Sequence, residues 1–222
     1  HIRVDKNKKG DQIYNGAHDN ATGIGGVLEI AQAFSTLKNK PERSVSILAV
    51  MAEEQGLLGS KYYAQNPIIP LTKTVANINM DSLNVLGKVK EISVQGKGKS
   101  EMDNYLATAV KKQDRTLIEG DNPSAGYYYR SDHFNFAKVG IPALYAGGGA
   151  TPVDAKTAEY RKKMSLIVRG CYHQPCDKYR ESWDLSGAQQ DVQLFFDVGY
   201  QIANDDKWPA WSKGAEFKRP SK

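Results

Sequence analysis

The chain of 222 residues contains only two cysteines, Cys171 and Cys176, and it has no long apolar run. Two cysteines are too few for a disulfide scaffold, but one local bridge between them is plausible and would indicate an oxidising compartment. The alternative is a thiolate metal site, although the four residues between the cysteines are not the usual zinc-finger spacing. Because no apolar run approaches the roughly 18 residues that a membrane-spanning helix needs, we predict no membrane span.

The sequence also lacks an internal repeat, a low-complexity tract and any shift in composition that would mark a second domain. With 40% hydrophobic residues and a mean hydropathy of -0.55, the chain is long enough for one well-buried domain, and we expect residues 1–222 to form it. No signal peptide is visible. Since the chain starts at His1 without an initiator methionine, we expect a processed or trimmed product, so the removal of a targeting segment stays open.

The net charge of +5 and the isoelectric point near 9.0 do not come from one basic cluster. Lysines and arginines are scattered along the chain, and no nucleic-acid-binding motif accompanies them. We therefore interpret the charge as solvated surface and predict no nucleic-acid partner. No feature of the sequence indicates an oligomeric state.

Apolar periodicity and turn residues divide the chain into alternating helices and strands. Residues 1–15 are predicted as a loop or edge segment, and residues 151–176 as a long irregular stretch of the kind that carries sites. The alternation predicts an α/β fold with a mostly parallel sheet. We expect helices over 23–38, 55–65, 101–113, 131–138 and 186–205, and strands over 44–51, 75–80, 91–95 and 141–146.

Carboxylates follow two of the predicted buried strands. Glu53 and Glu54 come just after the first strand, Asp81 follows the second, and Asp19 lies directly ahead of the first helix. Ligands of an α/β sheet gather beyond the carboxyl ends of its strands, so we expect these acids to lie close together. Zinc takes carboxylate and imidazole ligands, and His173 is available in a suitable context. The pattern predicts a metal site.

Each of these acids also has an interpretation without a metal. Asp19 would cap the helix that follows it, and for this residue alone capping is the better interpretation, although it does not exclude metal binding. Glu53 and Glu54 would complement the dipole at a helix start, and Asp81 would cap a turn. Similarly, the consecutive tyrosines 127–129 either line a substrate pocket or pack in the interior.

Taken together, five motifs are more specific than any of them alone. They are Gly16-Ala-His-Asp-Asn-Ala-Thr-Gly23, Ala52-Glu-Glu-Gln-Gly-Leu-Leu-Gly-Ser60, Asn79-Met-Asp-Ser82, Ser131-Asp-His-Phe-Asn-Phe136 with Gly140-Ile-Pro-Ala143, and Tyr172-His-Gln-Pro-Cys-Asp-Lys-Tyr179. In this order they resemble the zinc-dependent aminopeptidase family, which also includes glutamate carboxypeptidase and glutaminyl cyclase. The resemblance implies a three-layer α/β sandwich, with a mixed but mostly parallel central sheet and helices on both faces.

The resemblance also implies a ligand set for two zinc ions. Asp19 would bridge the ions, Glu54 and His173 would complete the set of one ion, and Asp81 would bind the other. A bridging carboxylate shared by two ions is the usual arrangement when both act on the same water.

Two further residues take catalytic roles by the same resemblance. Glu53 would be the general base that deprotonates the attacking water, and Tyr172 would help to polarise the scissile carbonyl. The implied activity is that of a dizinc exopeptidase acting on peptides, foremost an aminopeptidase. A carboxypeptidase or dipeptidase, a single-zinc glutaminyl cyclase and a non-catalytic module that has lost a metal are the alternatives. Family and the possible Cys171–Cys176 bridge together predict a secreted or periplasmic protein.

The sequence has three other histidines, His1, His18 and His133. The family's first ligand is the earlier histidine of a His-x-Asp-His pattern, and by register His1 matches the later one. We therefore expect the liganding histidine and some N-terminal strands to lie before residue 1, unless His1 itself is the ligand. The family places Asp132 and His133 outside the ligand set, as its supporting shell, and His18 is treated as a variable position.

Overall fold

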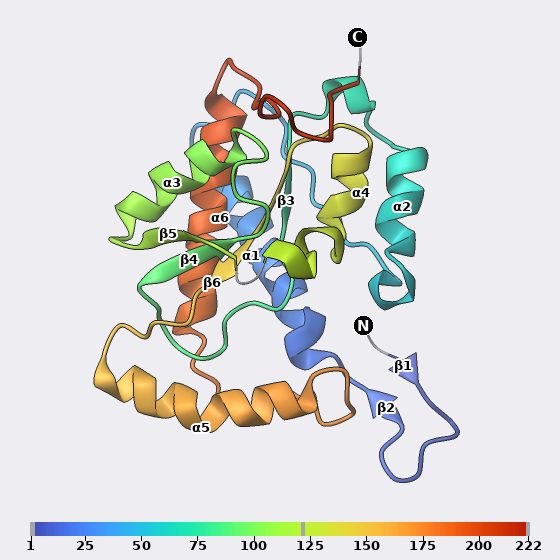
Figure 1. Ribbon diagram of the computed structural model, residues 1–222, viewed down its shortest axis with the longest axis vertical. Coiled ribbons are helices and arrows are strands. Elements are labelled where there is room, and N and C mark those ends of the chain that lie inside the picture. The colour runs from blue at the N-terminus through green and yellow to red at the C-terminus, as the bar shows by residue number, and fades with distance from the viewer. Residues whose placement is uncertain (1–2, 121–122, 221–222) are drawn as a thin grey trace.

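A computed structural model of the protein describes residues 3–120 and 123–220 (Figure 1). Short helical turns occupy Ala17–Ala21, Glu53–Gln55, Leu71–Lys73, Pro123–Ala125 and Tyr127–Tyr129. The strands are β1 (Arg3–Val4), β2 (Ile13–Tyr14), β3 (Asn77–Asn79), β4 (Glu91–Val94), β5 (Thr116–Glu119) and β6 (Ala143–Gly148). The helices are α1 (Thr22–Thr36), α2 (Leu58–Gln65), α3 (Met102–Lys112), α4 (His133–Lys138), α5 (Ala155–Cys171) and α6 (Ser186–Asn204).

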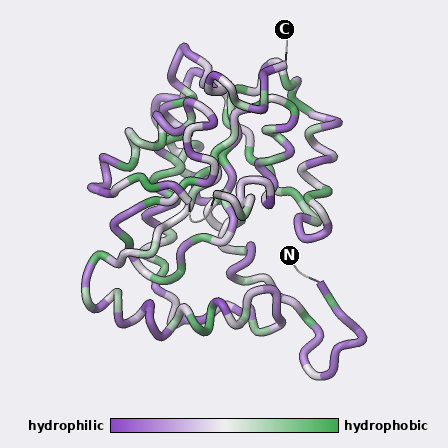
Figure 2. The backbone as a smooth tube through the Cα atoms, in the orientation of Figure 1, coloured by the Kyte–Doolittle hydropathy of each residue, from purple (hydrophilic) through white to green (hydrophobic). Residues whose placement is uncertain are grey.

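The main sheet has the strand order β3-β6-β4-β5. The β3–β6 and β4–β5 pairs are parallel, whereas β4 and β6 run antiparallel. This confirms the mixed, mostly parallel sheet. A separate antiparallel pair, β1 with β2, forms a hairpin within the segment predicted as a loop or edge. Figure 2 shows this hairpin as largely hydrophilic, unlike the interior strands.

Helices cover both faces of the sheet, as a three-layer α/β sandwich requires. The main core joins β4 and β6 to α1, α3 and α6 through fully buried side chains such as Ile92, Leu106, Leu144 and Phe195. A smaller cluster on the other face packs α2 and α4 against the sheet around Phe136. Burial of these apolar side chains is the main force that holds the layers together.

The strand predicted over residues 44–51 is wrong. The structure shows no strand there, and Ile47 is 44% exposed and Met51 78% exposed. A central strand needs hydrogen-bonded neighbours and cover on its faces, whereas among the described residues the sheet ends at β3. The apolar composition of the run was therefore a poor guide to its pairing.

Two other elements differ from the sequence prediction. Strand β5 was not predicted, and helix α5 occupies most of the stretch predicted as irregular. Asp154 caps α5 by accepting a hydrogen bond from the backbone N–H of Thr157 at 2.7 Å. Only Met164 of this helix is buried, so α5 has no periodic apolar face that its sequence would reveal. The other predicted helices and strands are present, with ends shifted by a few residues.

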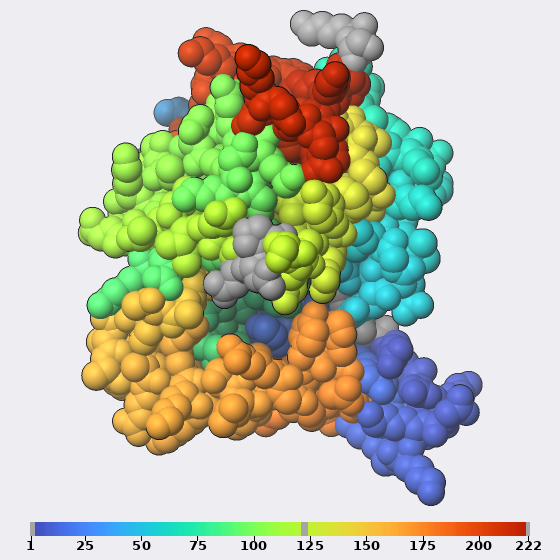
Figure 3. Space-filling view, in the orientation of Figure 1, coloured from blue at the N-terminus to red at the C-terminus, as the bar shows by residue number. Residues whose placement is uncertain are grey.

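Helix α5 lies apart from the three layers, across the lower end of the molecule in Figure 1. In the space-filling view a hollow separates α5 from the segments around residue 125 above it (Figure 3). Within residues 3–120 and 123–220, no helix combines the length and apolarity that crossing a bilayer would take.

Candidate metal centre

Turns and loops at one end of the molecule carry the predicted metal ligands. Asp19 lies in the helical turn before α1, and Glu53 and Glu54 form the turn that precedes α2. Asp81 comes two residues after β3, and His173 comes two residues after α5. These segments are far apart in sequence, but they meet where α1 begins and α5 ends (Figure 1).

Asp19, Glu54 and His173 form one compact cluster. The Nε2 atom of His173 lies 2.9 Å from Oδ2 of Asp19 and 2.7 Å from Oε1 of Glu54. The three residues offer ligand atoms that all lie within 4.8 Å of one another. Asp19 is only 4% exposed, while the histidine side chain is 43% exposed, so one side of the cluster faces solvent. Two carboxylates and an imidazole are a donor set that fits zinc.

Asp81 is not a member of this cluster of three, and a chain of hydrogen bonds orients its carboxylate. The hydroxyl of Ser131 donates to Oδ2 of Asp81 at 2.7 Å, and the side-chain amide of Asn79 donates to the same hydroxyl at 2.8 Å. Ser131 is 2% exposed, so the hydroxyl that links the two bonds is itself buried. Sequence reasoning placed Ser131 in a motif but gave it no role, and the role follows only from this contact.

Two tyrosines share the electrostatic environment of the acids. Burial, followed by the negative charges of Asp19, Asp81 and both glutamates of the turn, raises the pKa of Tyr172. Burial also raises the pKa of Tyr145 on β6, and Asp81, Tyr172, Glu53 and Asp19 add to the effect. The ring of Tyr172 stacks on that of His173, with centroids 3.8 Å apart. Sequence reasoning missed Tyr145, because an aromatic residue inside a strand looks like an ordinary core residue.

The backbone around the candidate ligands adopts unusual conformations. Ala52, Ser82 and His173 have φ angles of 59°, 59° and 55°, in the left-handed region that non-glycine residues rarely occupy. The first precedes Glu53, the second follows Asp81, and the third is itself a candidate ligand. Such conformations cost about 1–3 kcal/mol each and collect at functional sites, where surrounding contacts hold them.

Close packing supports the glutamate turn. A Cβ atom at Gly59, in the first turn of α2, would collide with the backbone of Met51. The backbone N–H of Gly59 donates to the carbonyl of Met51 at 3.0 Å. This approach places the start of α2 directly against the residue that precedes the turn, and only glycine allows it.

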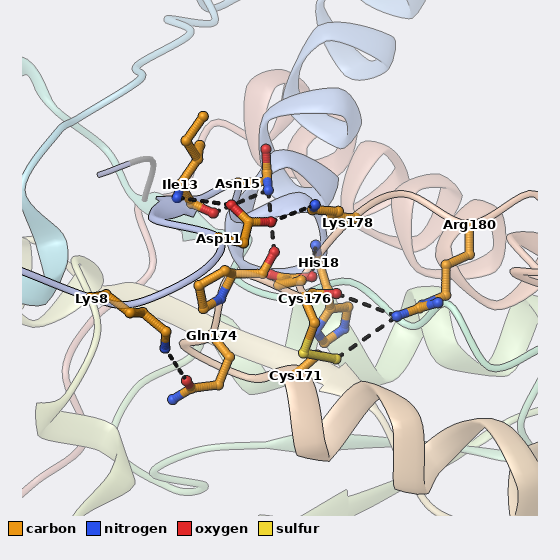
Figure 4. The surroundings of a disulfide bond; sticks show 12 residues. Lys8, Asp11, Ile13, Asn15, His18, Cys171, Gln174, Cys176, Lys178 and Arg180 are labelled. Carbon is orange, nitrogen blue, oxygen red and sulfur yellow. Dashed lines mark hydrogen bonds and ion pairs between the residues drawn. A yellow bond between two sulfur atoms is a disulfide. The ribbon is translucent and has the colours of Figure 1, made fainter. Parts of the chain in front are cut away.

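A disulfide joins Cys171 to Cys176, which confirms the predicted local bridge (Figure 4). The bridge closes a short loop that contains Tyr172 and His173. Both sulfur atoms are used in it, so the thiolate metal site is not formed. The bridge fits a protein of an oxidising compartment.

The other two histidines that the structure describes, His18 and His133, lie outside the cluster of three. The side chain of His133 is fully buried between the rings of Tyr128 and Tyr145, and this burial lowers its pKa to about 3. His18 approaches the carbonyl oxygen of Leu83 with Nε2, at 3.2 Å. His1 lies outside the described residues.

Asp132 and the three consecutive tyrosines 127–129 precede His133 in the chain. The hydroxyl of Ser60 donates to the carboxylate of Asp132, so Asp132 is bonded to α2. Of the three consecutive tyrosines, Tyr128 packs in the interior, whereas Tyr127 and Tyr129 are 45% and 40% exposed. Packing is therefore the correct interpretation for the middle tyrosine.

Several curated proteins are similar to this chain. Leupeptin-inactivating enzyme 1 of Streptomyces exfoliatus is 30% identical over 174 residues, which is 75% of this chain and 38% of that protein. Aminopeptidase Y of Saccharomyces cerevisiae is 30% identical over 182 residues, or 76% of this chain and 30% of that protein. A probable glutamate carboxypeptidase of Arthroderma benhamiae is 29% identical over 220 residues, or 89% of this chain and 28% of that protein. The chain thus spans roughly a third of these relatives' length.

Solved structures show the same fold at lower identity. An aminopeptidase from Aneurinibacillus sp. strain AM-1 superposes with a TM-score of 0.63 at 21% identity, covering 93% of this chain and 44% of that one. A glutaminyl cyclase of Porphyromonas gingivalis gives a TM-score of 0.54 at 18% identity, covering 84% of this chain and 63% of that one. In addition, the family model for peptidase family M28 matches residues 3–196. Since this match spans most of the chain, the protein belongs to peptidase family M28, the zinc-dependent peptidases that its five motifs resemble.

Proposed function

We propose that this chain forms the catalytic centre of a two-zinc exopeptidase that removes N-terminal residues from peptides. The observation that carries the proposal is the convergence of Asp19, Glu54 and His173, whose ligand atoms lie within 4.8 Å of one another. These residues come from three separate motifs, and a mere helix cap or dipole pair would not bring all three together. The names of the aminopeptidase relatives add support for this direction of attack on the peptide.

The proposed ligand assignment follows the resemblance to the family's motifs. Asp19 would be shared by the two ions, Glu54 and His173 would complete the set of one ion, and Asp81 would hold the other. Asp81 is oriented by Ser131 and contributes to the same electrostatic environment as Asp19. Bound zinc lowers the pKa of water and polarises a carbonyl group.

Glu53 and Tyr172 act on the substrate in this proposal. Glu53 stands next to Glu54 in the same turn, and its charge acts on Tyr172 and Tyr145 together with the charges of Asp19 and Asp81. In this proposal its carboxylate accepts the proton of the attacking water and passes it to the leaving amine. The hydroxyl of Tyr172 is protonated near neutral pH, because the ordinary pKa of a tyrosine is about 10. A protonated hydroxyl donates a hydrogen bond to the carbonyl oxygen as negative charge develops there.

The test combines metal content with one conservative substitution. Elemental analysis of the dialysed protein is expected to give two zinc ions per chain. Glu53→Gln is expected to keep the zinc and lower kcat for an unblocked peptide by about 10²–10⁴-fold, the usual contribution of a general base. Glu29→Gln, an exposed glutamate on α1, is the matched control and leaves kcat unchanged. A zinc-loaded protein that hydrolyses no peptide, or a Glu53→Gln variant of full activity, would contradict the proposal.

The same assays separate the alternatives. A carboxypeptidase would still cleave peptides blocked at the amino terminus but would not cleave peptides blocked at the carboxyl terminus. Release of ammonia from an N-terminal glutamine, together with one zinc per chain, would indicate a glutaminyl cyclase. A chain without zinc would be a binding module.

We also propose that the protein acts outside the cytosol, as a secreted or periplasmic protein. The Cys171–Cys176 disulfide supports this, because such bonds persist in oxidising compartments. Thiol titration of protein isolated from its source under non-reducing conditions, with alkylation at lysis, is expected to find no free thiol. Two free thiols would remove the support.

A further inference from the structure

The carboxylate of Asp177 ties the turn that carries Asp19 to the loop that carries His173. Its Oδ1 accepts a hydrogen bond from the backbone N–H of His18 at 2.8 Å, and its Oδ2 accepts one from the N–H of Asp19 at 3.1 Å. The backbone carbonyl of Asp177 accepts a third bond, from the N–H of Ala17 at 3.1 Å. Asp177 is 5% exposed, so water does not replace these bonds.

A carboxylate suits this position for a chemical reason. Two consecutive backbone N–H groups point at it, and an ionised aspartate has two acceptor oxygens and no donor. Hydrogen bonds to a charged acceptor are about twice as strong as neutral ones. An asparagine would present its NH₂ group to one of the two N–H donors, which leaves a buried donor without an acceptor.

The turn of Asp19 is fixed on its other side as well. The side-chain amide of Asn20 donates to the carbonyl of Met80 at 3.0 Å, and its oxygen accepts from the N–H of Ser82 at 3.0 Å. These two bonds straddle Asp81. With the turn held on that side, the bonds to Asp177 determine how it faces the loop of His173.

Two other contacts join residues shortly before this turn to the loop of His173, one of them exposed and one partly buried. Lys178 pairs with Asp11 at 2.6 Å, and the side chain of Asn15 donates to the carbonyl of Pro175 at 3.2 Å (Figure 4). The side chains of Lys178 and Asp11 are 55% and 42% exposed. An exposed ion pair of this kind contributes little. Asp177 is the carboxylate in this connection that is buried and bonded to the turn of Asp19 itself.

We propose that Asp177 is a positioning residue of the metal centre, and that its two hydrogen bonds set the placement of Asp19 relative to His173 and thereby the affinity for zinc. The inference rests on the proposed zinc site. Nε2 of His173 lies 2.9 Å from Oδ2 of Asp19, and both residues belong to the cluster of three proposed ligands. Ligands must be held within about 0.5 Å of the productive geometry, so losing their support weakens binding.

The experiment measures zinc affinity rather than activity. The purified protein is stripped of metal, and its dissociation constant for zinc is determined by competition with a chromogenic chelator. Asp177→Asn is expected to weaken zinc binding by about 10–100-fold, the usual effect of removing a group that supports a ligand. Asp11→Asn is the matched control, because it removes an exposed carboxylate that pairs with Lys178 in the residues next to Asp177. Its zinc affinity is expected to stay within about threefold of wild type.

Thermal unfolding with chelator and with zinc separates positioning from stability. Positioning predicts that zinc raises the melting temperature of Asp177→Asn by less than it raises that of the wild type. An equal rise, with affinity within about threefold of the wild type, would show a merely structural role and overturn the inference. Should Asp177→Asn be isolated unfolded, Asp177→Glu, which keeps the charge but displaces it, is judged by the same criteria. A wild-type protein without affinity for zinc would instead overturn the proposed function, and this inference with it.

Discussion

The ion pair between Arg115 and Asp191 lies inside the protein and predicts a large loss of stability when it is broken. Nη1 of Arg115 lies 2.8 Å from Oδ1 of Asp191, and the two side chains are 1% and 0% exposed. The second carboxylate oxygen accepts from the N–H of Gly148 at 3.1 Å, and Nη2 of Arg115 donates to the carbonyl of Glu91 at 2.8 Å. The pair thus joins α6 to β4, β5 and β6.

The substitution Asp191→Ala removes one charge and leaves the guanidinium buried. Breaking a buried pair in this way costs about 3–5 kcal/mol, which is a large part of the roughly 5–15 kcal/mol that a folded protein has. For a chain of this size, 1 kcal/mol corresponds to about 2–4 °C, so the melting temperature is expected to fall by about 6–20 °C. The double substitution Arg115→Met with Asp191→Leu removes both charges and is expected to regain part of the loss.

Urea unfolding followed by circular dichroism measures these differences, with a chelator present so that bound metal does not contribute. The control is Glu159→Ala, which breaks the Lys163–Glu159 pair on α5, whose side chains are 73% and 71% exposed. Its free energy of unfolding is expected to change by at most about 0.5 kcal/mol. The reasoning is refuted if Asp191→Ala loses less than about 1 kcal/mol, or if the double substitution is as unstable as the single one.

Two other predictions concern titrating groups. The hydrogen bond that the Tyr172 hydroxyl would donate to the substrate carbonyl predicts that Tyr172→Phe lowers kcat by about 10²-fold at unchanged zinc content. A variant with the kcat of the wild type would contradict this. The pKa of His133 is lowered to about 3, so its imidazole stays neutral in the folded state. In the unfolded chain the same imidazole takes up a proton below about pH 6.5. The free energy of unfolding therefore decreases as the pH falls from about 6.5 towards 3. Between pH 7 and 4.5 the wild type is expected to lose about 2 kcal/mol more than His133→Phe in urea unfolding, and equal losses would argue against a buried neutral histidine.

Local sequence signals predicted most of the fold. Helix α6 begins at the expected residue, Ser186, because its apolar positions recur at helical spacing and reach the core at Leu194, Phe195 and Val198. Helix α5 has no such stripe, since Met164 is its one buried residue among those described. A helix that packs little leaves no apolar period, and no sequence pattern separated it from a loop.

The apolar run 44–51 shows the opposite error. Its composition is that of a buried strand, but a strand exists only through hydrogen bonds to a neighbour, and no described strand pairs with it. Pairing is a property of distant segments. The same holds for β5, whose place beside β4 depends on the turn and helix between them and not on its own four residues.

The candidate metal centre also depends on both local contacts and contacts between distant segments. The glutamate turn is held by nearby bonds, such as those from the N–H groups of Gly56 and Leu57 to the carbonyl of Glu53 at 3.0 and 2.8 Å. Motifs record such local geometry, which is why they named the three clustered residues, Asp19, Glu54 and His173, even though the run before the turn is not a strand. The contacts that fix one turn against another, from Asn20 and Asp177, join residues about 60 and 160 positions apart. Such contacts leave no spacing that a single sequence displays. The sequence could therefore predict that Asp19, Glu54 and His173 come together, whereas the residues that hold their turns against one another emerge only from the folded chain.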